Sequence, residues 1–390
     1  MAKLGIDYGT TNTVVVCSDR GRYPVVPHLS DSSVGVIARD VFPSIAVRDR
    51  NDGTLVFGAD AERCLFRPGA EEKFDVIQSP KRWLRDFYDG GVVGTESVAG
   101  GFDPLILLKY FAESLRKSVL RSGLISADDQ MDAVITCPAN ANGAQRYLTR
   151  RCFREAGINV VGAMNEPSAA AIEFADRLTH GNRIAARSLD TSIGVFDLGG
   201  GTFDVSIVRI QGDNFSVVDS AGIERLGGDD FDEVLARMFA DRFKIGYDTL
   251  RPFQKTLLLA RARQQKESIS SGHVRTMSLS SQDIGIEGHV GTVSVSDYCD
   301  EIRRMMKPAM KLLVSLIEGK AAKAAGIGRN GLSAVYMVGG SSKLPVVSEL
   351  VADALPDAKI VMTDKPFTAT ATGAAINSSE GVRLHEILSR

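Results

Sequence analysis

The chain has 390 residues, of which 44% are hydrophobic and 24% are charged, and its formal net charge at pH 7 is −2. A chain so close to neutrality lacks the excess of basic side chains that binding to a phosphate backbone requires, so we do not expect it to bind nucleic acid. Its length exceeds what one hydrophobic core supports, which predicts two lobes around a cleft.

The five cysteines are an odd number and form no C-x-x-C pair, which is typical of a reducing compartment. The first residues lead directly into an apolar strand, so no targeting leader is expected. No uninterrupted apolar run reaches the ~18 residues of a membrane-spanning helix. We therefore expect a cytoplasmic protein without a membrane partner. The five histidines lack the spacing of metal ligands and are expected at the surface or in loops.

A strand–turn–strand pattern occurs twice, about half the chain apart. Residues 4–16 contain an apolar strand that ends at Asp7, a turn of Gly and Thr, and a β-branched strand. Residues 194–208 repeat this order around Asp197. Each pattern predicts a β-hairpin. We expect one hairpin in each lobe, with the two turns facing each other across the cleft.

The residue types in these turns suit a nucleotide phosphate. Glycine allows backbone N–H groups to approach an anion, and successive N–H groups in a turn form an anion-binding nest. Threonine hydroxyls add hydrogen bonds, and the Asp at each strand end can orient water on Mg²⁺. Two such hairpins could therefore hold the β- and γ-phosphates of a nucleotide from opposite sides.

Further segments fit the same cleft. A buried strand at 133–138 precedes a helix at 145–155, and a strand at 160–164 leads to Glu166. Pro167 suits the first position of a helix, which places Glu166 at a strand-to-helix corner on the lip of the cleft. A strand from 334 ends in a Gly-Gly turn and a helix start, where the backbone could pass close to a sugar, an α-phosphate or a base.

These segments together resemble the nucleotide-binding domain of the 70-kDa heat-shock (DnaK-type) chaperones, which belongs to the actin-like ATPase superfamily. Sugar kinases and actins share the hairpins, but not the combination of Asp-Leu-Gly-Gly-Gly-Thr-Phe-Asp with Asn-Glu-Pro-x-Ala-Ala-Ala. The resemblance implies an α/β fold of the duplicated, ribonuclease H-like type, and a slow ATPase that acts in the stress response. The matching stretches, in the family's order, are 5–12, 165–171, 196–205, 227–232, 338–345 and 373–375.

The resemblance also implies roles for individual residues. Asp7 and Asp197 would bind Mg²⁺ through water, and Glu166 or Asp197 would accept the proton of the attacking water. The implied ligands are ATP or ADP with Mg²⁺, and K⁺ stays open as a further cation. The implied phosphate contacts are Gly9, Thr10, Thr11, Asn12, Gly199, Gly200, Gly201 and Thr202. The implied nucleoside contacts are Lys266, Ser270, Gly339, Gly340, Ser341 and Lys343. Pro138 and Arg146 correspond to the family's proline switch and its inter-domain relay arginine.

The family's catalytic Lys is replaced. An ungapped match places Glu62 at its position, where a carboxylate would repel the γ-phosphate, and Arg63 next to it could partly replace the Lys. Lys81 and Arg82 match a different family segment and are poorer candidates. The implied catalytic set is therefore Asp7, Thr10, Arg63, Glu166, Asp197 and Thr202.

Other departures concern the nucleoside and the partners. Arg263 and Glu267 nearly invert the charges that are usual on the adenine-contact helix, and Phe367 replaces a customary Asp. A J-domain co-chaperone and a nucleotide-exchange factor are implied partners, although residues 162–164 lack the Arg that often docks J-domains. Protein clients would require a peptide-binding domain elsewhere, because none is expected in this chain.

The predicted organisation is lobe I at 1–185, with an insertion at about 30–101, and lobe II at 186–390, with an upper subdomain at about 222–298. Three functions stay open. The first is a slow chaperone ATPase whose lobes close on ATP and open after hydrolysis. The second is a catalytically weak nucleotide sensor or assembly module, and the third is an actin-like filament protein.

Overall fold

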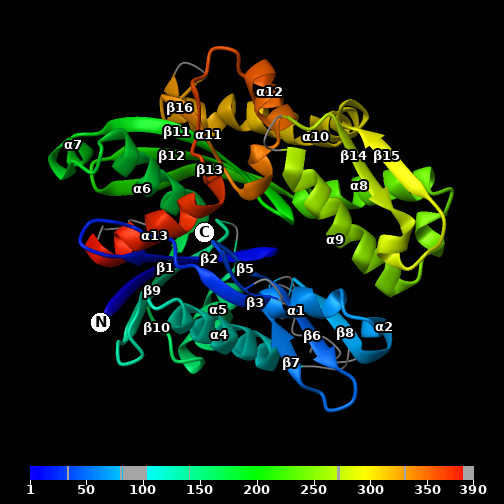
Figure 1. Cartoon of the computed structure of the whole chain (residues 1–390). Helices are drawn as coiled ribbons and strands as arrows, with labels where there is room; N and C mark the ends of the chain where they lie inside the picture. Colours follow the sequence, from blue (N-terminus) through cyan, green and yellow to red (C-terminus); the bar gives the residue numbers. More distant parts are fainter. Residues whose placement is uncertain are drawn as a thin grey trace.

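Two five-stranded β-sheets form the centre of the molecule (Figure 1). The computed structural model describes residues 1–32, 35–79, 81, 103–139, 141–269, 273–328 and 331–380. We call the part built on the first sheet lobe I and the part built on the second sheet lobe II. The predicted α/β fold class is confirmed. In the described part of the chain, no helix has the length and apolar character needed to cross a membrane.

The sheet of lobe I has the strand order β10-β9-β1-β2-β5. Strand β1 pairs antiparallel with β2 and parallel with β9, and β9 pairs parallel with β10. The strands are rich in β-branched residues and are mostly buried, as expected for a sheet that is covered by helices. Their bounds are β1 Ala2–Tyr8, β2 Asn12–Ser18, β5 Phe42–Pro43, β9 Met131–Cys137 and β10 Asn159–Asn165.

The sheet of lobe II repeats this plan, with the order β13-β12-β11-β16-β17. Strand β11 pairs antiparallel with β12 and parallel with β16. In each lobe, therefore, the first strand of the predicted hairpin lies between its hairpin partner and a parallel strand. The bounds are β11 Asp190–Leu198, β12 Thr202–Gln211, β13 Asn214–Glu224, β16 Ala334–Val338 and β17 Ile360–Met362.

Helices cover the two sheets. In lobe I, α4 and α5 pack against each other, and their apolar residues belong to the same core as β1 and β9. In lobe II, α10 packs on β12, β13 and α12. The helix bounds are α4 Pro104–Arg121, α5 Gly143–Glu155, α6 Glu166–Leu178, α7 Arg183–Arg187, α10 Val295–Ile317, α11 Lys320–Ala324, α12 Pro345–Ala354 and α13 Ala369–Glu380, with short 3-10 turns η6 Gly340–Lys343 and η7 Pro366–Thr368.

Two helices exchange places between the lobes. Helix α6, from the first half of the chain, packs on β11, β12 and β13, whereas α13, from the end of the chain, packs on β1, β2 and β9. The two helices contact each other between the sheets (Figure 1). Their backbones approach so closely at Gly373 that a Cβ atom there would lie 1.8 Å from the carbonyl oxygen of Ala169. One apolar core therefore runs through both lobes at this point.

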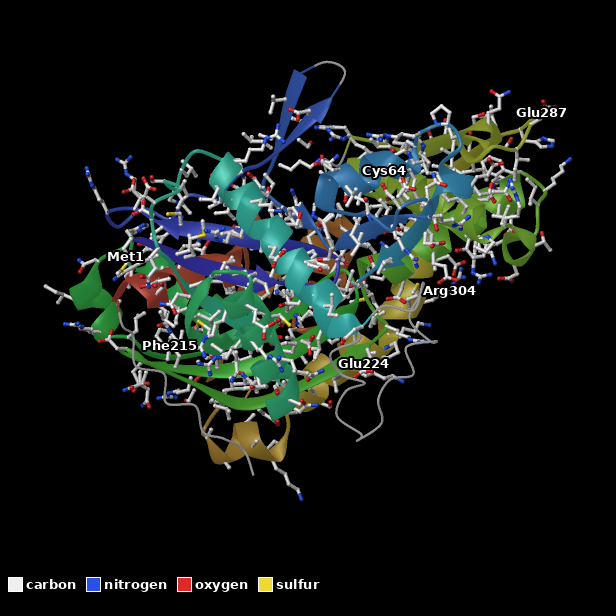
Figure 2. All side chains as sticks on the ribbon, turned by 90° about the horizontal axis from the view of Figure 1, so that it is seen from below. Met1, Cys64, Phe215, Glu224, Glu287 and Arg304 are labelled. Atoms are coloured by element: carbon white, nitrogen blue, oxygen red, sulfur yellow. The ribbon has the colours of Figure 1, made fainter. Side chains whose placement is uncertain are left out.

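Each lobe carries an insertion, and Figure 1 shows both on the same side of the molecule. The lobe I insertion comprises β3 His28–Ser32, β4 Gly35–Arg39, β6 Ile45–Asp49, β7 Leu55–Phe57, α1 Gly58–Leu65, α2 Ala70–Lys73 and β8 Phe74–Gln78. The lobe II insertion comprises α8 Gly228–Arg242, η3 Tyr247–Thr249, α9 Pro252–Ile269, β14 Thr276–Ser280, η4 Ser281–Ile284 and β15 Val290–Ser294. In Figure 2, Glu287 marks the periphery of the lobe II insertion, well separated from Met1.

The insertions touch each other across the cleft. Arg251 Nη1 lies 2.7 Å from Glu71 Oε2, and the guanidinium of Arg261 lies 4.7 Å from the ring centre of Phe66. Phe253 of α9 also packs against the apolar core of the lobe I insertion. These contacts hold the outer ends of the two lobes together.

The described elements agree closely with the predicted ones. Strand β10 ends at Asn165 and α6 begins at Glu166, so the strand-to-helix corner is confirmed. Residues 82–101 of the predicted insertion lie outside the described residues, and the lobe boundaries stay a prediction. One expectation is wrong: His28 is only 2% exposed and its Nδ1 lies 2.9 Å from Ser118 Oγ. Burial lowers the pKa of His28 to about 4.

A buried carboxyl group links α6 to the sheet of lobe II. Glu173 is 6% exposed, and it accepts a hydrogen bond from the hydroxyl of Tyr336 on β16. Arg177 Nε lies 3.8 Å from its second oxygen. Burial outweighs both of these neighbours and raises the pKa of Glu173 from 4.5 to about 7. The folded protein therefore favours the protonated form of this side chain.

We expect the stability contributed by protonated Glu173 to be present below pH 4.5 and to be lost as the pH rises through 7, because the folded state then retains a proton that the unfolded chain has released. The Glu173→Gln variant should be more stable than the wild type at pH 8 by about 2 kcal/mol, with a smaller difference at pH 5. Urea unfolding at both pH values measures this difference. The matched control is Glu155→Gln on the exposed face of α5, and equal pH dependence in all three proteins would contradict the prediction.

Candidate functional site

A cleft of about 1080 Å³ lies between the lobes, which is ample for a small-molecule ligand. Both hairpin turns, the α6 corner and the Gly-Gly turn after β16 line it. The structure brings most of the predicted site residues together here: Asp7, Gly9, Thr10, Thr11, Asn12, Glu166, Asp197, Gly199, Gly200, Gly201, Thr202, Lys266, Gly339, Gly340, Ser341 and Lys343. Ser270 lies outside the described residues.

The two hairpin turns meet across the cleft. A Cβ atom on Gly200 would lie 1.8 Å from Thr11 Oγ1, so the turn of lobe II can approach the turn of lobe I only with glycine at this position. The hydroxyl of Thr11 donates a hydrogen bond to the Asp229 carboxylate of α8 at 3.2 Å. The predicted opposition of the two turns is therefore present in the fold.

Four carboxylates gather at the inner part of the cleft. Asp7 and Asp197 stand at equivalent places near the ends of β1 and β11. The register of the β11–β12 hairpin sets Asp204 directly opposite Asp197, and Glu166 comes from the α6 corner. Like charges placed directly opposite on neighbouring strands repel each other. All four side chains line the cleft.

Burial and the closeness of these four carboxylates raise the pKa of three of them. Burial and the neighbouring Glu166 raise the pKa of Asp7 to about 6, against the opposing effects of Lys81 and of the Thr136 hydroxyl, which donates at 2.7 Å. Burial, Glu166 and Asp204 raise the pKa of Asp197 well above its ordinary value. Burial and Glu166 raise the pKa of Asp204 to about 6. A cation at this place would relieve the repulsion.

The chemistry of these side chains fits Mg²⁺, which prefers carboxylate and water oxygens. Within the described residues, no three His, Cys, Asp or Glu side chains are grouped closely enough to form a direct metal site. Carboxylates can also hold such an ion through its bound water molecules.

The position of the basic side chains differs from the prediction. Arg63 forms an ion pair with Asp60 on its own helix α1 and does not line the cleft. Glu62 also lies outside the cleft lining, where it forms an ion pair with Arg39. Lys81, the poorer candidate in the sequence, does line the cleft, and its Nζ lies 3.2 Å from Glu166 Oε1. The structure thus brings Lys81, and not Arg63, to the acidic group.

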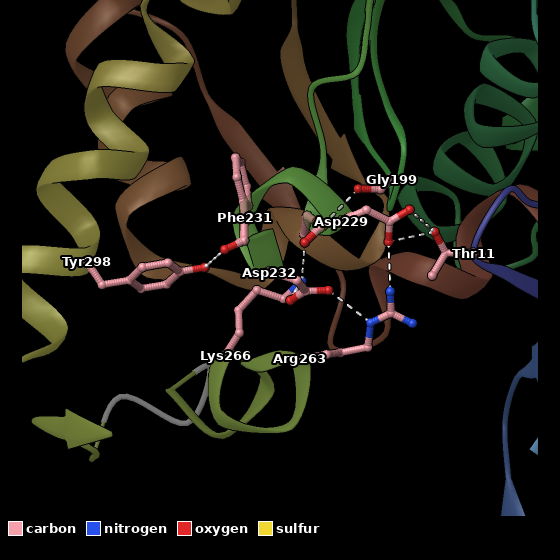
Figure 3. Close-up of polar contacts among 10 residues, drawn as sticks. Thr11, Gly199, Asp229, Phe231, Asp232, Arg263, Lys266 and Tyr298 are labelled. Carbon is pink, nitrogen blue, oxygen red and sulfur yellow. Dashed lines mark hydrogen bonds and ion pairs between the residues drawn. The ribbon is translucent and has the colours of Figure 1, made fainter. Parts of the chain in front are cut away.

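The predicted nucleoside contacts lie at the lobe II side of the cleft. Ser341 Oγ donates to the Gly199 carbonyl at 2.8 Å, which joins the Gly-Gly turn to the β11–β12 turn. Lys266 Nζ donates to the Gly228 carbonyl at 2.7 Å and lies 2.7 Å from Asp232 (Figure 3). Phe367, where an Asp is customary in the resemblance, also lines the cleft.

A polar bridge between the lobes was missed in the sequence. Arg263 of α9 donates through Nη2 to Asp229 at 2.8 Å and through Nε to Asp232 at 2.9 Å (Figure 3). Because Asp229 also accepts from Thr11, Arg263 is linked through one carboxylate to the turn of lobe I. The sequence shows the charge inversion at Arg263, but the partners of Arg263 become clear only where α8 and α9 pack against each other.

Two further cleft residues were also missed. Asp204 is the last residue of the Asp-Leu-Gly-Gly-Gly-Thr-Phe-Asp motif. Pairing the residues of the two strands across the predicted hairpin places Asp204 opposite Asp197, so the sequence could have identified it. Thr136, on β9, has no comparable signal in the sequence.

Arg146, predicted as a relay residue, ties two strand ends together. Its guanidinium donates to the carbonyl of Pro138 at 3.2 Å and to Asn165 Oδ1 at 2.6 Å. Arg146 therefore connects the end of β9 to the residue before Glu166. Its role as a relay stays a prediction.

Comparison with known proteins supplies the decisive finding. The sequence profile described as "Hsp70 protein" matches residues 117–382, which is more than half of the chain. The chain belongs to the Hsp70 family. Its two lobes have the actin-like ATPase fold of that family's nucleotide-binding domain, as the resemblance implied.

Individual relatives agree with this assignment. The chain is 33% identical to a protein named "Chaperone protein HscA homolog" from Tolumonas auensis and 31% identical to one of the same name from Bordetella petrii. Each match covers 96% of this chain and 57% of the relative. The chain thus spans less than two thirds of the length of these curated relatives.

Proposed function

We propose that this Hsp70-family chain binds ATP and ADP with Mg²⁺ in the cleft and hydrolyses ATP slowly, as the nucleotide-binding domain of a chaperone in the cytoplasm. The observation that carries the proposal is the meeting of two Gly/Thr turns and four carboxylates in one cleft. The turns suit phosphate oxygens, and the carboxylates suit the cation and water of phosphoryl transfer. The proposal leaves open whether K⁺ binds as a second cation.

In the proposed reaction, the oxygen of a water molecule bonds to the γ-phosphorus. The bond from this phosphorus to the β,γ-bridging oxygen breaks, and its electron pair leaves with ADP. The proton of the water passes to Glu166 or Asp197, both of which line the cleft. When bound, Mg²⁺ supplies positive charge to the phosphate oxygens, and Asp7 and Asp197 would hold it through water. The turn residues Thr10 and Thr202 would orient the phosphates.

The contacts between the insertions support cycling between closed and open states. Separating the lobes would break the ion pair of Arg251 with Glu71 and the packing of Arg261 on Phe66. Exposed contacts of this kind are individually weak, so a nucleotide that bridges the two turns can shift the equilibrium between the open and the closed state. A J-domain co-chaperone, an exchange factor and protein clients would then read out the nucleotide state.

A nucleotide sensor or assembly module without turnover is the second candidate. The observation in its favour is that the helix carrying Glu62 and Arg63 brings no cation to the cleft. Phosphoryl transfer depends on positive charge at the γ-phosphate, and the loss of such a charge would slow it strongly.

Calorimetric titration and single-turnover hydrolysis test the proposal together. We expect the wild type to bind Mg²⁺·ATP and ADP more tightly than AMP, because the turns contact the phosphates, and to convert the bound ATP to ADP. The absence of nucleotide binding would contradict the proposal. Binding without conversion would favour the sensor, and sedimentation of the protein only with ATP would favour a filament.

A further inference from the structure

Arg225 follows β13, and the backbone on each side of it contacts the β11–β12 turn. Before it, Glu224 is the last residue of β13 and pairs with Thr202 across the sheet. After it, Gly228 N donates to the Gly199 carbonyl at 3.0 Å. The short segment that contains Arg225 is therefore held against the turn that is expected to contact phosphate.

The backbone of Arg225 has a conformation that is uncommon for a residue with a side chain. Its φ is 55°, in the left-handed region that favours glycine. The next residue, Leu226, is buried in the apolar core of lobe II, whereas Arg225 is exposed and lines the cleft. Among the described residues, Arg225 is the one non-glycine residue with a positive φ that also lines the cleft. Backbone strain of this kind is concentrated at functional sites.

The basic side chains that line the cleft fall into two groups. Lys81, Arg263 and Lys266 each pair with an acidic side chain. The side chains of Arg225 and Lys343 form no hydrogen bond or ion pair with any described residue. Lys343 belongs to η6 at the Gly-Gly turn, where the nucleoside contacts are predicted. Arg225 is therefore the unpaired cation beside the β11–β12 turn.

A terminal phosphate at this turn would need positive charge close to it. The four carboxylates at the inner part of the cleft oppose the approach of an anion. A guanidinium can form two parallel hydrogen bonds with phosphate oxygens, and it stays charged at every pH at which proteins are folded. Because Arg225 has no acidic partner, it can contact a phosphate without breaking an ion pair.

We propose that Arg225 contacts the terminal phosphate of ATP at the β11–β12 turn and stabilises the negative charge that develops there during hydrolysis. The inference rests on the proposed function, to which it adds a positively charged contact from lobe II. Arginine side chains that reach the transferred phosphate accelerate phosphoryl transfer in other enzymes. ADP lacks the terminal phosphate, so the contact would also favour ATP over ADP.

Arg225→Gln removes the charge and retains a polar side chain. We expect the affinity for ATP to fall about tenfold and the affinity for ADP to change less than about threefold. Single-turnover hydrolysis should fall about 100-fold. Arg225→Lys keeps the charge but loses the two parallel hydrogen bonds, so both of its values should lie between those of the wild type and Arg225→Gln. The matched control is Arg20→Gln, because Arg20 is also exposed and has a φ of 50°, but lies outside the cleft lining.

Arg225→Gly separates the role of the side chain from the strain of the backbone. Glycine adopts a φ of 55° without strain, so this variant should unfold at a temperature close to that of the wild type. Its hydrolysis and its preference for ATP should nevertheless fall as in Arg225→Gln. Wild-type hydrolysis and preference for ATP in either variant would overturn the inference, as would an equal loss of affinity for ATP and ADP.

The wild type distinguishes this inference from the proposed function. A wild type that binds ATP without hydrolysing it still tests Arg225 through the preference for ATP over ADP, and loss of that preference in Arg225→Gln supports the inference. A wild type that binds no nucleotide would contradict the proposed function and, with it, the inference.

Discussion

The Asp197→Asn variant should lose hydrolysis by about 100-fold to 1000-fold while its affinity for ATP changes less than about threefold. Asp197 is half-buried and lines the cleft, directly opposite Asp204 in the β11–β12 register and close enough to Glu166 for that carboxylate to raise its pKa. Asparagine keeps the size of the side chain and removes the negative charge that would hold the cation or accept the proton of water. The effect should therefore fall on turnover.

Single-turnover hydrolysis and calorimetric titration of the same preparation measure the two quantities. Asp190→Asn is the matched control, because it makes the same change at the exposed start of the same strand, where Asp190 pairs with Arg209. Glu166→Gln, measured beside them, distinguishes the two candidate proton acceptors. Turnover in Asp197→Asn equal to that of the wild type would refute the catalytic role of Asp197.

The Gly373→Ala variant should lose at least about 3 kcal/mol of stability, a large share of the total for a protein of ordinary stability. The added Cβ atom would lie 1.8 Å from the carbonyl oxygen and 2.5 Å from the carbonyl carbon of Ala169. These are backbone atoms of α6, so no side chain can move aside to make room. Helices α6 and α13 would have to separate, and the apolar core between the two sheets would open.

Denaturant unfolding measures this loss, and the yield of folded protein is a second indicator. Gly143→Ala, at the start of α5, is the matched control because the added Cβ atom meets no atom within 4 Å. Its stability should change by less than about 0.5 kcal/mol or increase slightly, since alanine favours a helix more than glycine does. Equal stability of the two variants would show that the helices tolerate a wider spacing.

The position of Lys81 in the cleft changes what the family assignment implies for the turnover of ATP. The ungapped match of Glu62 to the family's Lys predicts a protein that binds nucleotide and turns it over poorly. In the fold, Glu62 pairs with Arg39 outside the cleft lining, and its negative charge is balanced there. Lys81 lies at the acidic group, with its Nζ 3.2 Å from Glu166 Oε1, so the cleft has a positive charge there.

Local patterns in the sequence were sufficient for the hairpins, the Glu166 corner and the Gly-Gly turn after β16, all of which line the cleft. A strand, a Gly/Thr turn and a second strand are adjacent in the chain, and their residue types alone favour a β-hairpin. The repetition of this pattern around Asp7 and Asp197 predicted that two turns would share one site. Pro167 marked the start of α6 because proline is well suited to the first helical position.

The tertiary structure decided several features that depend on segments far apart in the chain. The exchange of α6 and α13 between the lobes, the burial of His28, the pairing of Arg263 with Asp229 and the choice of Lys81 over Arg63 all belong to this class. None of these contacts has a local signal, because a side chain's partner is set by the packing of whole helices and strands. The sequence by itself determined which chemical groups were available, and the packing determined which of them meet.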